Sequence, residues 1–149
     1  MALTKCDTCS ASIWLICACF AIGGCSTMSG AERAQLQQEL QANRPTCRGK
    51  AQCEAMWDAA RDWVVSNCAM KIQTITDSYI DTYNPPPYSP SIACEVTKDP
   101  RPSGGYELHM RVWCNNIFGC QPTWASSLQA FEASVNATTA RFDRRQTAH

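Results

Sequence analysis

The chain is 149 residues long, enough for one ordinary domain with a hydrophobic core and too short for two. Its 13 basic and 13 acidic residues balance to a formal net charge of zero. Nucleic-acid-binding proteins usually carry a basic stripe and a high pI, so this balance argues against a nucleic-acid partner.

The first feature along the chain is an apolar run at residues 13–22, followed by Gly23, Gly24 and Cys25. The run is shorter than the ~20 residues of a membrane-spanning helix and falls within the ~7–15 residues of a signal-peptide core. With the small residues and the cysteine, it resembles the signal of a bacterial lipoprotein precursor, whose cysteine becomes the lipidated, palmitate-carrying N-terminus. The resemblance implies a membrane anchor on Cys25. Because Ser26 rather than aspartate follows, it also implies the outer membrane, with the domain facing the periplasm.

Cleavage before Cys25 predicts a signal peptide at residues 1–24, a lipidated tether with a stalk helix at 25–46, and an α+β domain at 47–149. Cys19 offers a competing cleavage point, but cleavage there would leave apolar residues exposed at the mature start.

Removing the signal peptide and acylating Cys25 would leave six of the eleven cysteines. Six is an even number in an oxidising compartment, so three disulfides are expected, although many pairings are formally possible. The spacing favours the pairs Cys47–Cys53, Cys68–Cys94 and Cys114–Cys120. A four-cysteine zinc site is the alternative, but structural zinc cysteines usually lie closer together in the sequence. We therefore expect no metal and no cofactor.

A capping box formed by Ser29 and Glu32 opens a predicted helix at residues 30–43, whose thin apolar face consists of Leu36 and Leu40. Such a helix would be a loosely packed stalk.

A better-patterned helix is predicted at residues 50–67, and a final helix at 122–142 has apolar residues at 4-3-4-3-4 spacing. Between them the period changes to two, which predicts strands at 70–82, 91–98 and 106–114. The expected fold is α+β: a small three-stranded antiparallel sheet packed by helices in a disulfide-bonded two-layer sandwich. Apolar residues on both faces of the first strand require it to be bulged or split near Asp77 and Ser78.

The pattern Cys-x5-Cys-x3-Trp, the extended segment at 71–83 and the segment 114–120 together resemble a group of small uncharacterised proteobacterial lipoproteins. This resemblance implies no known activity.

Trp113 points away from Leu108 in its predicted strand, toward the outer face of the sheet. We expect a helix to cover that face and to make Trp113 part of the core. On a bare face, Trp113, Tyr79 and Tyr83 would instead form an exposed aromatic patch, which is typical of a binding surface.

Ile117 and Phe118 lie at the tip of the proposed Cys114–Cys120 ring, which is too tight to hide both side chains. We expect them to fold back against the final helix. The alternative is that they project outward as a stiffened apolar tip that docks a partner.

No Ser/His/Asp, Cys/His or metal-binding constellation can be assembled from the sequence, and His109 is expected on an outward strand face, so the chain is not expected to be an enzyme. The expected function is that of an envelope lipoprotein with a structural or protein-interaction role and a periplasmic protein partner. A small-ligand or cell-wall-binding module is the alternative.

Overall fold

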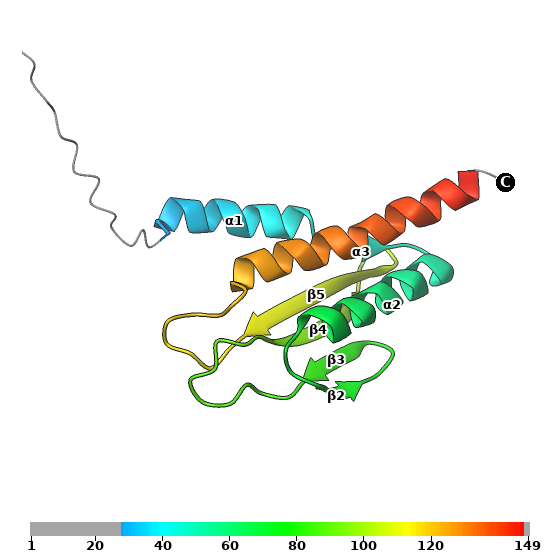
Figure 1. Cartoon of the computed structure of the whole chain (residues 1–149). Helices are drawn as coiled ribbons and strands as arrows, with labels where there is room; N and C mark the ends of the chain where they lie inside the picture. Colours follow the sequence, from blue (N-terminus) through cyan, green and yellow to red (C-terminus); the bar gives the residue numbers. More distant parts are fainter. Residues whose placement is uncertain (1–27, 148–149) are drawn as a thin grey trace, which may run out of the picture.

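The computed structural model describes residues 28–147, so the predicted signal peptide and Cys25 lie outside the described residues (Figure 1). The elements in chain order are α1 (Gly30–Ala42), β1 (Thr46–Cys47), α2 (Lys50–Asn67), β2 (Ile72–Ile75), β3 (Tyr79–Thr82), β4 (Ala93–Pro100), β5 (Tyr106–Trp113) and α3 (Trp124–Thr147). No helix in this part of the chain has the length and apolar character needed to cross a membrane.

The fold is α+β, but the expectation of a three-stranded sheet is wrong. The strands form one antiparallel sheet of five, in the order β1-β5-β4-β3-β2. The predicted strand at 70–82 is split near Asp77 and Ser78, one of the two irregularities expected there, and forms a hairpin of two strands. The Thr76 amide donates to the Tyr79 carbonyl at 2.8 Å and turns the chain. The fifth strand, β1, pairs only Thr46 and Cys47 with the start of β5.

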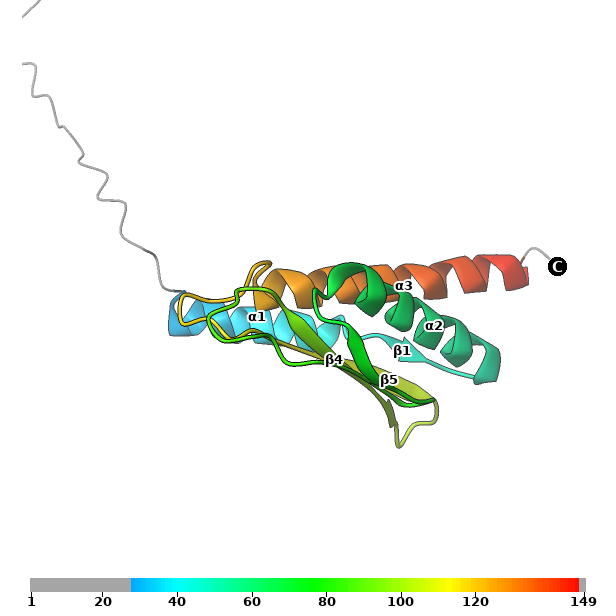
Figure 2. The ribbon, with the colours of Figure 1, turned by 60° about the horizontal axis from the view of Figure 1, so that its bottom comes forward.

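Both long helices cover the same face of the sheet (Figures 1 and 2). The buried stripe of α2 includes Met56 and Trp63, and α3 buries Phe131 and Val135. The rings of Trp63 and Phe131 meet edge to face at 5.5 Å between centroids. This helix-covered face holds the core because apolar side chains repeat at helical spacing in α2 and α3 and at every second position in the strands. The core residues are Cys47, Cys53, Met56, Trp57, Ala60, Trp63, Val64, Cys68, Ile80, Ile92, Cys94, Val96, Leu108, Phe131 and Val135.

The first helix has the predicted capping box: the Glu32 amide donates to Ser29 Oγ at 3.2 Å, and the Ser29 amide donates to Glu32 Oε2 at 2.7 Å. It lies beside α3, with Leu40 buried and Asn136 Nδ2 donating to the Asn43 carbonyl at 2.7 Å. These contacts dock the C-terminal half of α1 on the domain.

All six cysteines of the described residues are paired as expected, in Cys47–Cys53, Cys68–Cys94 and Cys114–Cys120. The first disulfide ties β1 to the first turn of α2, the second ties the end of α2 to β4, and the third closes the loop between β5 and α3. The bridges therefore connect the helical layer to the sheet at both ends of α2.

Candidate functional site

The face of the sheet opposite α2 and α3 carries the main cluster of interacting polar and aromatic side chains. On β4, Cys94 and Val96 are buried toward the helices, so alternation turns Glu95 and Thr97 to the other side. The strand register pairs Glu95 with Arg111 across the sheet. We call this side the open face, and its residues on β3, β4 and β5 are Tyr79, Asp81, Ala93, Glu95, Thr97, Asp99, Glu107, His109, Arg111 and Trp113.

A chain of contacts crosses three strands of the open face. Tyr79 Oη donates to Glu95 Oε2 at 3.1 Å, and Arg111 Nη2 donates to the same oxygen at 2.9 Å. The Arg111 guanidinium lies 4.8 Å from the centre of the Trp113 ring, a cation–π contact. Trp113 Nε1 in turn donates to Asn84 Oδ1 at 3.0 Å. The network links five side chains on a surface that no described helix covers.

Desolvation and the hydrogen bond to Glu95 raise the pKa of Tyr79, so its phenol keeps its proton and remains a donor. This favours a positioned hydrogen-bonding group over a phenolate base.

A second cluster on the open face surrounds Glu107. Its carboxylate accepts from Arg44 Nη1 at 2.7 Å, lies 3.0 Å from His109 Nε2, and lies 3.8 Å from Arg101 Nε. The hydrogen bond from Arg44 is the main reason that the pKa of Glu107 is lowered, which keeps the carboxylate ionised. Glu107 therefore ties the segment after α1 to the sheet, and His109 has a carboxylate partner.

The structure corrects the expectation for Trp113. The residue is half-buried on the open face and is not part of the core, because both long helices pack on the opposite face. Tyr79 lies on the same face, and Tyr83 follows β3 with 55% of its surface exposed. The surface differs from a continuous aromatic patch, because Glu95 and Arg111 lie in the middle of the contact chain that links Tyr79 to Trp113.

Ile117 and Phe118 also differ from expectation. They are 86% and 93% exposed and project outward, whereas a fold back against α3 was expected. Part of the α3 surface that they were expected to cover is lined instead by Leu40 of α1. Tyr88, in the neighbouring loop, is 82% exposed and was missed at the sequence level. The stiff segment Pro-Pro-Pro-Tyr-Ser-Pro around Tyr88 was the feature of the sequence that could have indicated this exposure.

A cavity of about 320 Å³ opens between α1, β5 and α3, where Arg44, His109 and Glu132 line it together with Leu40 and Trp124. Glu132 is only 8% exposed, and this burial is the main reason that its pKa is raised to about 7. The positive charge of Arg44 lowers the pKa, whereas the negative charge of Glu39 raises it further. This buried acid was also missed. Glu132 directly follows Phe131, which belongs to the apolar face of α3, and this position was the only indication in the sequence that the acid is buried.

The described residues contain no group of three or more histidine, cysteine or acidic side chains that could hold a metal ion. Each cysteine in this part of the chain is in a disulfide, so none offers a thiolate nucleophile. The open face is therefore suited to binding another molecule through its polar and aromatic side chains.

The class that the structure defines is a small disulfide-bonded α+β domain in which the described helices leave one face of the sheet uncovered. No protein-family model, curated protein or solved structure matches the chain.

Proposed function

We propose that this chain is a bacterial lipoprotein, attached to the outer membrane through an acylated Cys25 and facing the periplasm, with a structural or protein-binding role in the envelope. Two observations support the attachment and the compartment. The apolar run ending in Gly23, Gly24 and Cys25 resembles a lipoprotein signal. The disulfides pair all six described cysteines, and such bonds persist in oxidising compartments such as the periplasm.

Acylation is tested by metabolic labelling with a palmitate analogue. Wild-type protein should take up the label and sediment with membranes. A Cys25→Ala variant should take up none, and should either be released or accumulate as an uncleaved precursor. Label that persists in the variant would contradict acylation at this position.

We place the partner surface on the open face, and the contact of Arg111 with both Glu95 and Trp113 carries this proposal. Tryptophan, tyrosine and arginine dominate the binding energy of protein interfaces. Here the contacts hold them in place before binding, which lowers the entropy lost when a partner docks. We propose binding rather than catalysis.

The test is crosslinking in intact cells followed by pull-down of the lipoprotein. Trp113→Ala and Arg111→Ala should each lower partner capture by about tenfold or more, because a hot-spot residue contributes roughly 2 kcal/mol. Val65→Ser is the matched control, since Val65 is 65% exposed on α2 and should leave capture unchanged. If Trp113→Ala and Arg111→Ala capture as much partner as the wild-type protein does, with unchanged melting curves, the open face has no role in binding.

A second candidate function is small-ligand binding in the cavity between α1 and α3. Its volume of about 320 Å³ is at the lower end of ligand-pocket sizes, and it holds the perturbed acid Glu132 beside Arg44. Saturable binding of a small molecule or cell-wall fragment by the purified protein, lost on Glu132→Gln but retained by Trp113→Ala, would favour this function.

A further inference from the structure

We infer that Tyr88, Ile117 and Phe118 insert into the lipid surface that carries the Cys25 anchor, so that the domain touches the membrane at two points. We call these three residues the tip. The inference rests on the proposed acylation of Cys25 and adds the orientation of the domain on the membrane.

The tip consists of side chains with almost no protein contacts. Tyr88, Ile117 and Phe118 are 82%, 86% and 93% exposed, although a soluble surface gains nothing from presenting two large apolar residues side by side. They come from two loops, one between β3 and β4 and one between β5 and α3.

Hydrogen bonds join the two loops into one rigid unit. Asn116 Nδ2 donates to the Tyr88 carbonyl at 2.7 Å, and the Asn115 amide donates to the Ser89 carbonyl at 3.2 Å. The Phe118 amide donates to Asn116 Oδ1 at 2.8 Å, which sets the direction of the turn.

Backbone strain and a disulfide add to this rigidity. Tyr88 has a φ of +64°, a conformation that a tyrosine adopts only where its surroundings impose it. The Cys114–Cys120 disulfide closes the second loop at its base. The hydrogen bonds and the disulfide therefore hold the two loops in a conformation that points the tip outward.

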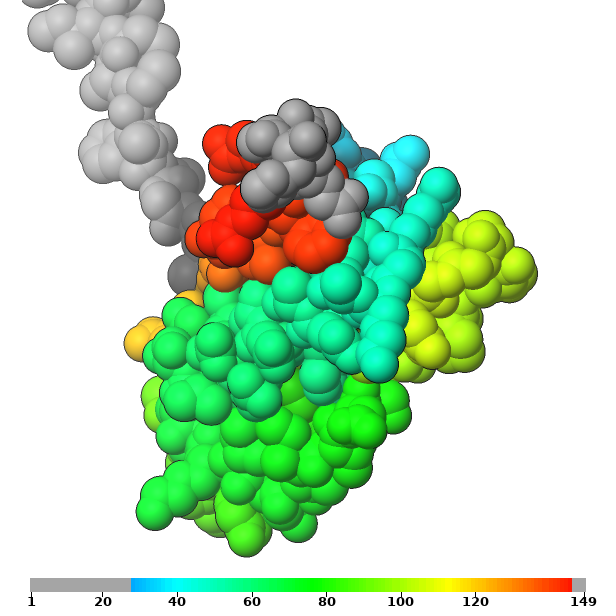
Figure 3. Space-filling view, turned by 90° about the vertical axis from the view of Figure 1, so that its right-hand side faces the viewer, coloured from blue at the N-terminus to red at the C-terminus, as the bar shows by residue number. Residues whose placement is uncertain are grey.

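The two loops that carry the tip are uncharged. Residues 82–94 and 112–131, which contain both loops, include no aspartate, glutamate, lysine or arginine. The opposite end differs, because Lys98, Asp99 and Arg101 lie at the β4–β5 turn and Lys50 begins α2. Figure 3 views that opposite end, where this turn projects beside α2. The two loops that carry the tip can therefore approach a bilayer interior without desolvating a charge of their own.

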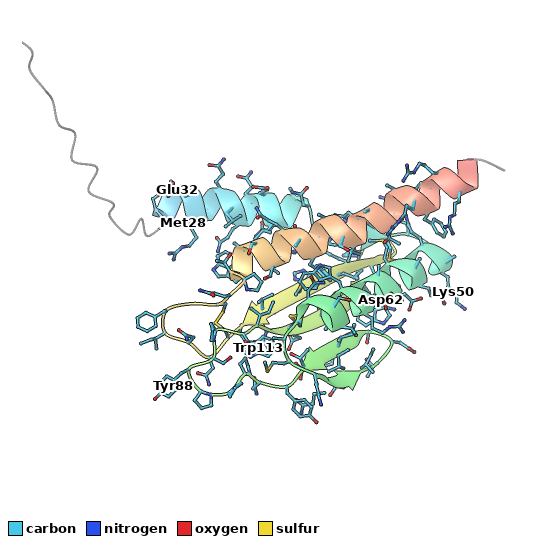
Figure 4. All side chains as sticks on the ribbon, in the orientation of Figure 1. Met28, Glu32, Lys50, Asp62, Tyr88 and Trp113 are labelled. Atoms are coloured by element: carbon cyan, nitrogen blue, oxygen red, sulfur yellow. A yellow bond between two sulfur atoms is a disulfide. The ribbon has the colours of Figure 1, made fainter. Side chains whose placement is uncertain are left out.

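The tip and the start of α1 lie at the same end of the molecule. Both loops and the first turn of α1 reach the left-hand side in Figures 1 and 2, and Figure 4 labels Met28 and Tyr88 there. Cys25 precedes Met28 by three residues, a stretch of chain that spans at most about 11 Å. A membrane that holds an acylated Cys25 therefore lies against this end of the domain.

The occupant is a lipid surface rather than a protein for two reasons. The three side chains project from the protein surface, which suits insertion between lipid headgroups better than docking in a protein interface of standard size. The anchor also makes the second contact intramolecular, so that even weak insertion is highly populated.

The experiment uses full-length wild-type protein, processed in a bacterial host and reconstituted in vesicles of phosphatidylethanolamine and phosphatidylglycerol. The vesicles contain a lipid with a photoactivatable diazirine in its acyl chain, and the labelled residues are mapped by mass spectrometry. We expect labelling at Tyr88 and at Ile117 or Phe118 to exceed labelling at Val65 and Ile75 several-fold. Those controls are 65% and 48% exposed on other parts of the surface. Because the loops are uncharged, added salt should not change the result.

The variant Ile117→Ser with Phe118→Ser should lose the label on this loop while its melting temperature and its flotation with vesicles stay unchanged. An acylated protein that floats with vesicles but labels no more strongly at the tip than at Val65 would overturn the inference alone. In a second sample, without the diazirine lipid, Phe118 is replaced by the photoreactive p-benzoylphenylalanine and should crosslink to lipid. Crosslinks joining this position to a second copy would also overturn the inference and would assign the tip to self-association. Absence of an acyl group on Cys25 would overturn the proposed attachment, and with it the argument for the orientation.

Discussion

Glu132 makes the stability of this domain depend on pH in a direction that can be worked out from the structure. The carboxyl group is 8% exposed in α3, and burial raises its pKa from the ordinary 4.5 to about 7. Between these two pH values the folded protein keeps a proton that the unfolded chain has already released. The folded state binds more protons in this window, so the free energy of unfolding falls as the pH rises from about 4.5 through 7.

The two pKa values set the size of the effect. One unit of pKa difference between the folded and unfolded states corresponds to about 1.36 kcal/mol, so the loss of stability through Glu132 is at most roughly 3 kcal/mol. Glu132 lines a cavity that opens to solvent, and Arg44 favours its ionised form, so we expect a loss of about 1–3 kcal/mol above pH 7. Typical domains are stable by only about 5–15 kcal/mol, which makes this a measurable fraction.

Replacing Glu132 with glutamine keeps the shape of the side chain and removes its titration. Urea unfolding at pH 4, 5, 6, 7 and 8, with the disulfides intact, should give nearly equal stabilities at pH 4 and a variant that is about 1–3 kcal/mol more stable at pH 8. Every other titrating group is present in both proteins, so the difference between them isolates Glu132. Ser134→Ala, an exposed change on α3 that removes no titrating group, is the control and should not alter the pH dependence. A difference between wild type and Glu132→Gln that stays constant across the pH range would refute the reasoning.

Two further predictions concern the framework. Replacing Cys68 and Cys94 with alanine opens a loop of 27 residues and should lower the free energy of unfolding by roughly 3.6 kcal/mol, because the unfolded chain gains loop entropy. A loss below ~1 kcal/mol in urea unfolding would show that the bridge hardly constrains the unfolded chain. Gly105→Ala should destabilise the domain more than Gly104→Ala in thermal unfolding. Both glycines have positive φ, but only a Cβ at Gly105 would collide with the backbone of β1, so equal losses would contradict the close approach.

Periodicity and spacing were sufficient to predict the helices and the disulfides. The helix predicted at 50–67 has the bounds of α2, because its apolar stripe and its opposite charged face leave only one register. The three disulfides follow from an even count of cysteines and two equal short spacings.

The sheet was miscounted for two physical reasons. The β2–β3 turn at Asp77 and Ser78 contains neither glycine nor proline, so the sequence indicated an irregularity there but left a bulge and a split as alternatives. The side chain of Thr76 supports this turn, since its Oγ1 accepts from the Ser78 amide at 3.3 Å. The second reason is β1, because a two-residue strand is too short to show any period.

The site residues were predicted in part. Alternation placed Trp113 on the correct face of its strand, but a strand pattern does not reveal which face of a sheet the helices cover. The outward direction of Phe118 was missed for a related reason. The predicted stalk helix docks on α3 through Leu40 and lines part of the surface that the loop was expected to cover.

The proposed orientation places the two ends of the open face in different surroundings. Strand β5 ends at Trp113 near the tip, whereas Glu107 and its partner Arg101 lie toward the charged β4–β5 turn (Figures 1 and 4). With the tip in the membrane, Trp113 would lie nearest the lipid and the Glu107 end would point away from the bilayer. A large partner outside the membrane would then reach Glu107 more freely than Trp113, whereas a partner embedded in the membrane would have the opposite preference. The relative loss of capture in Arg101→Ala and Trp113→Ala variants therefore reports on which side of the anchored domain the partner binds.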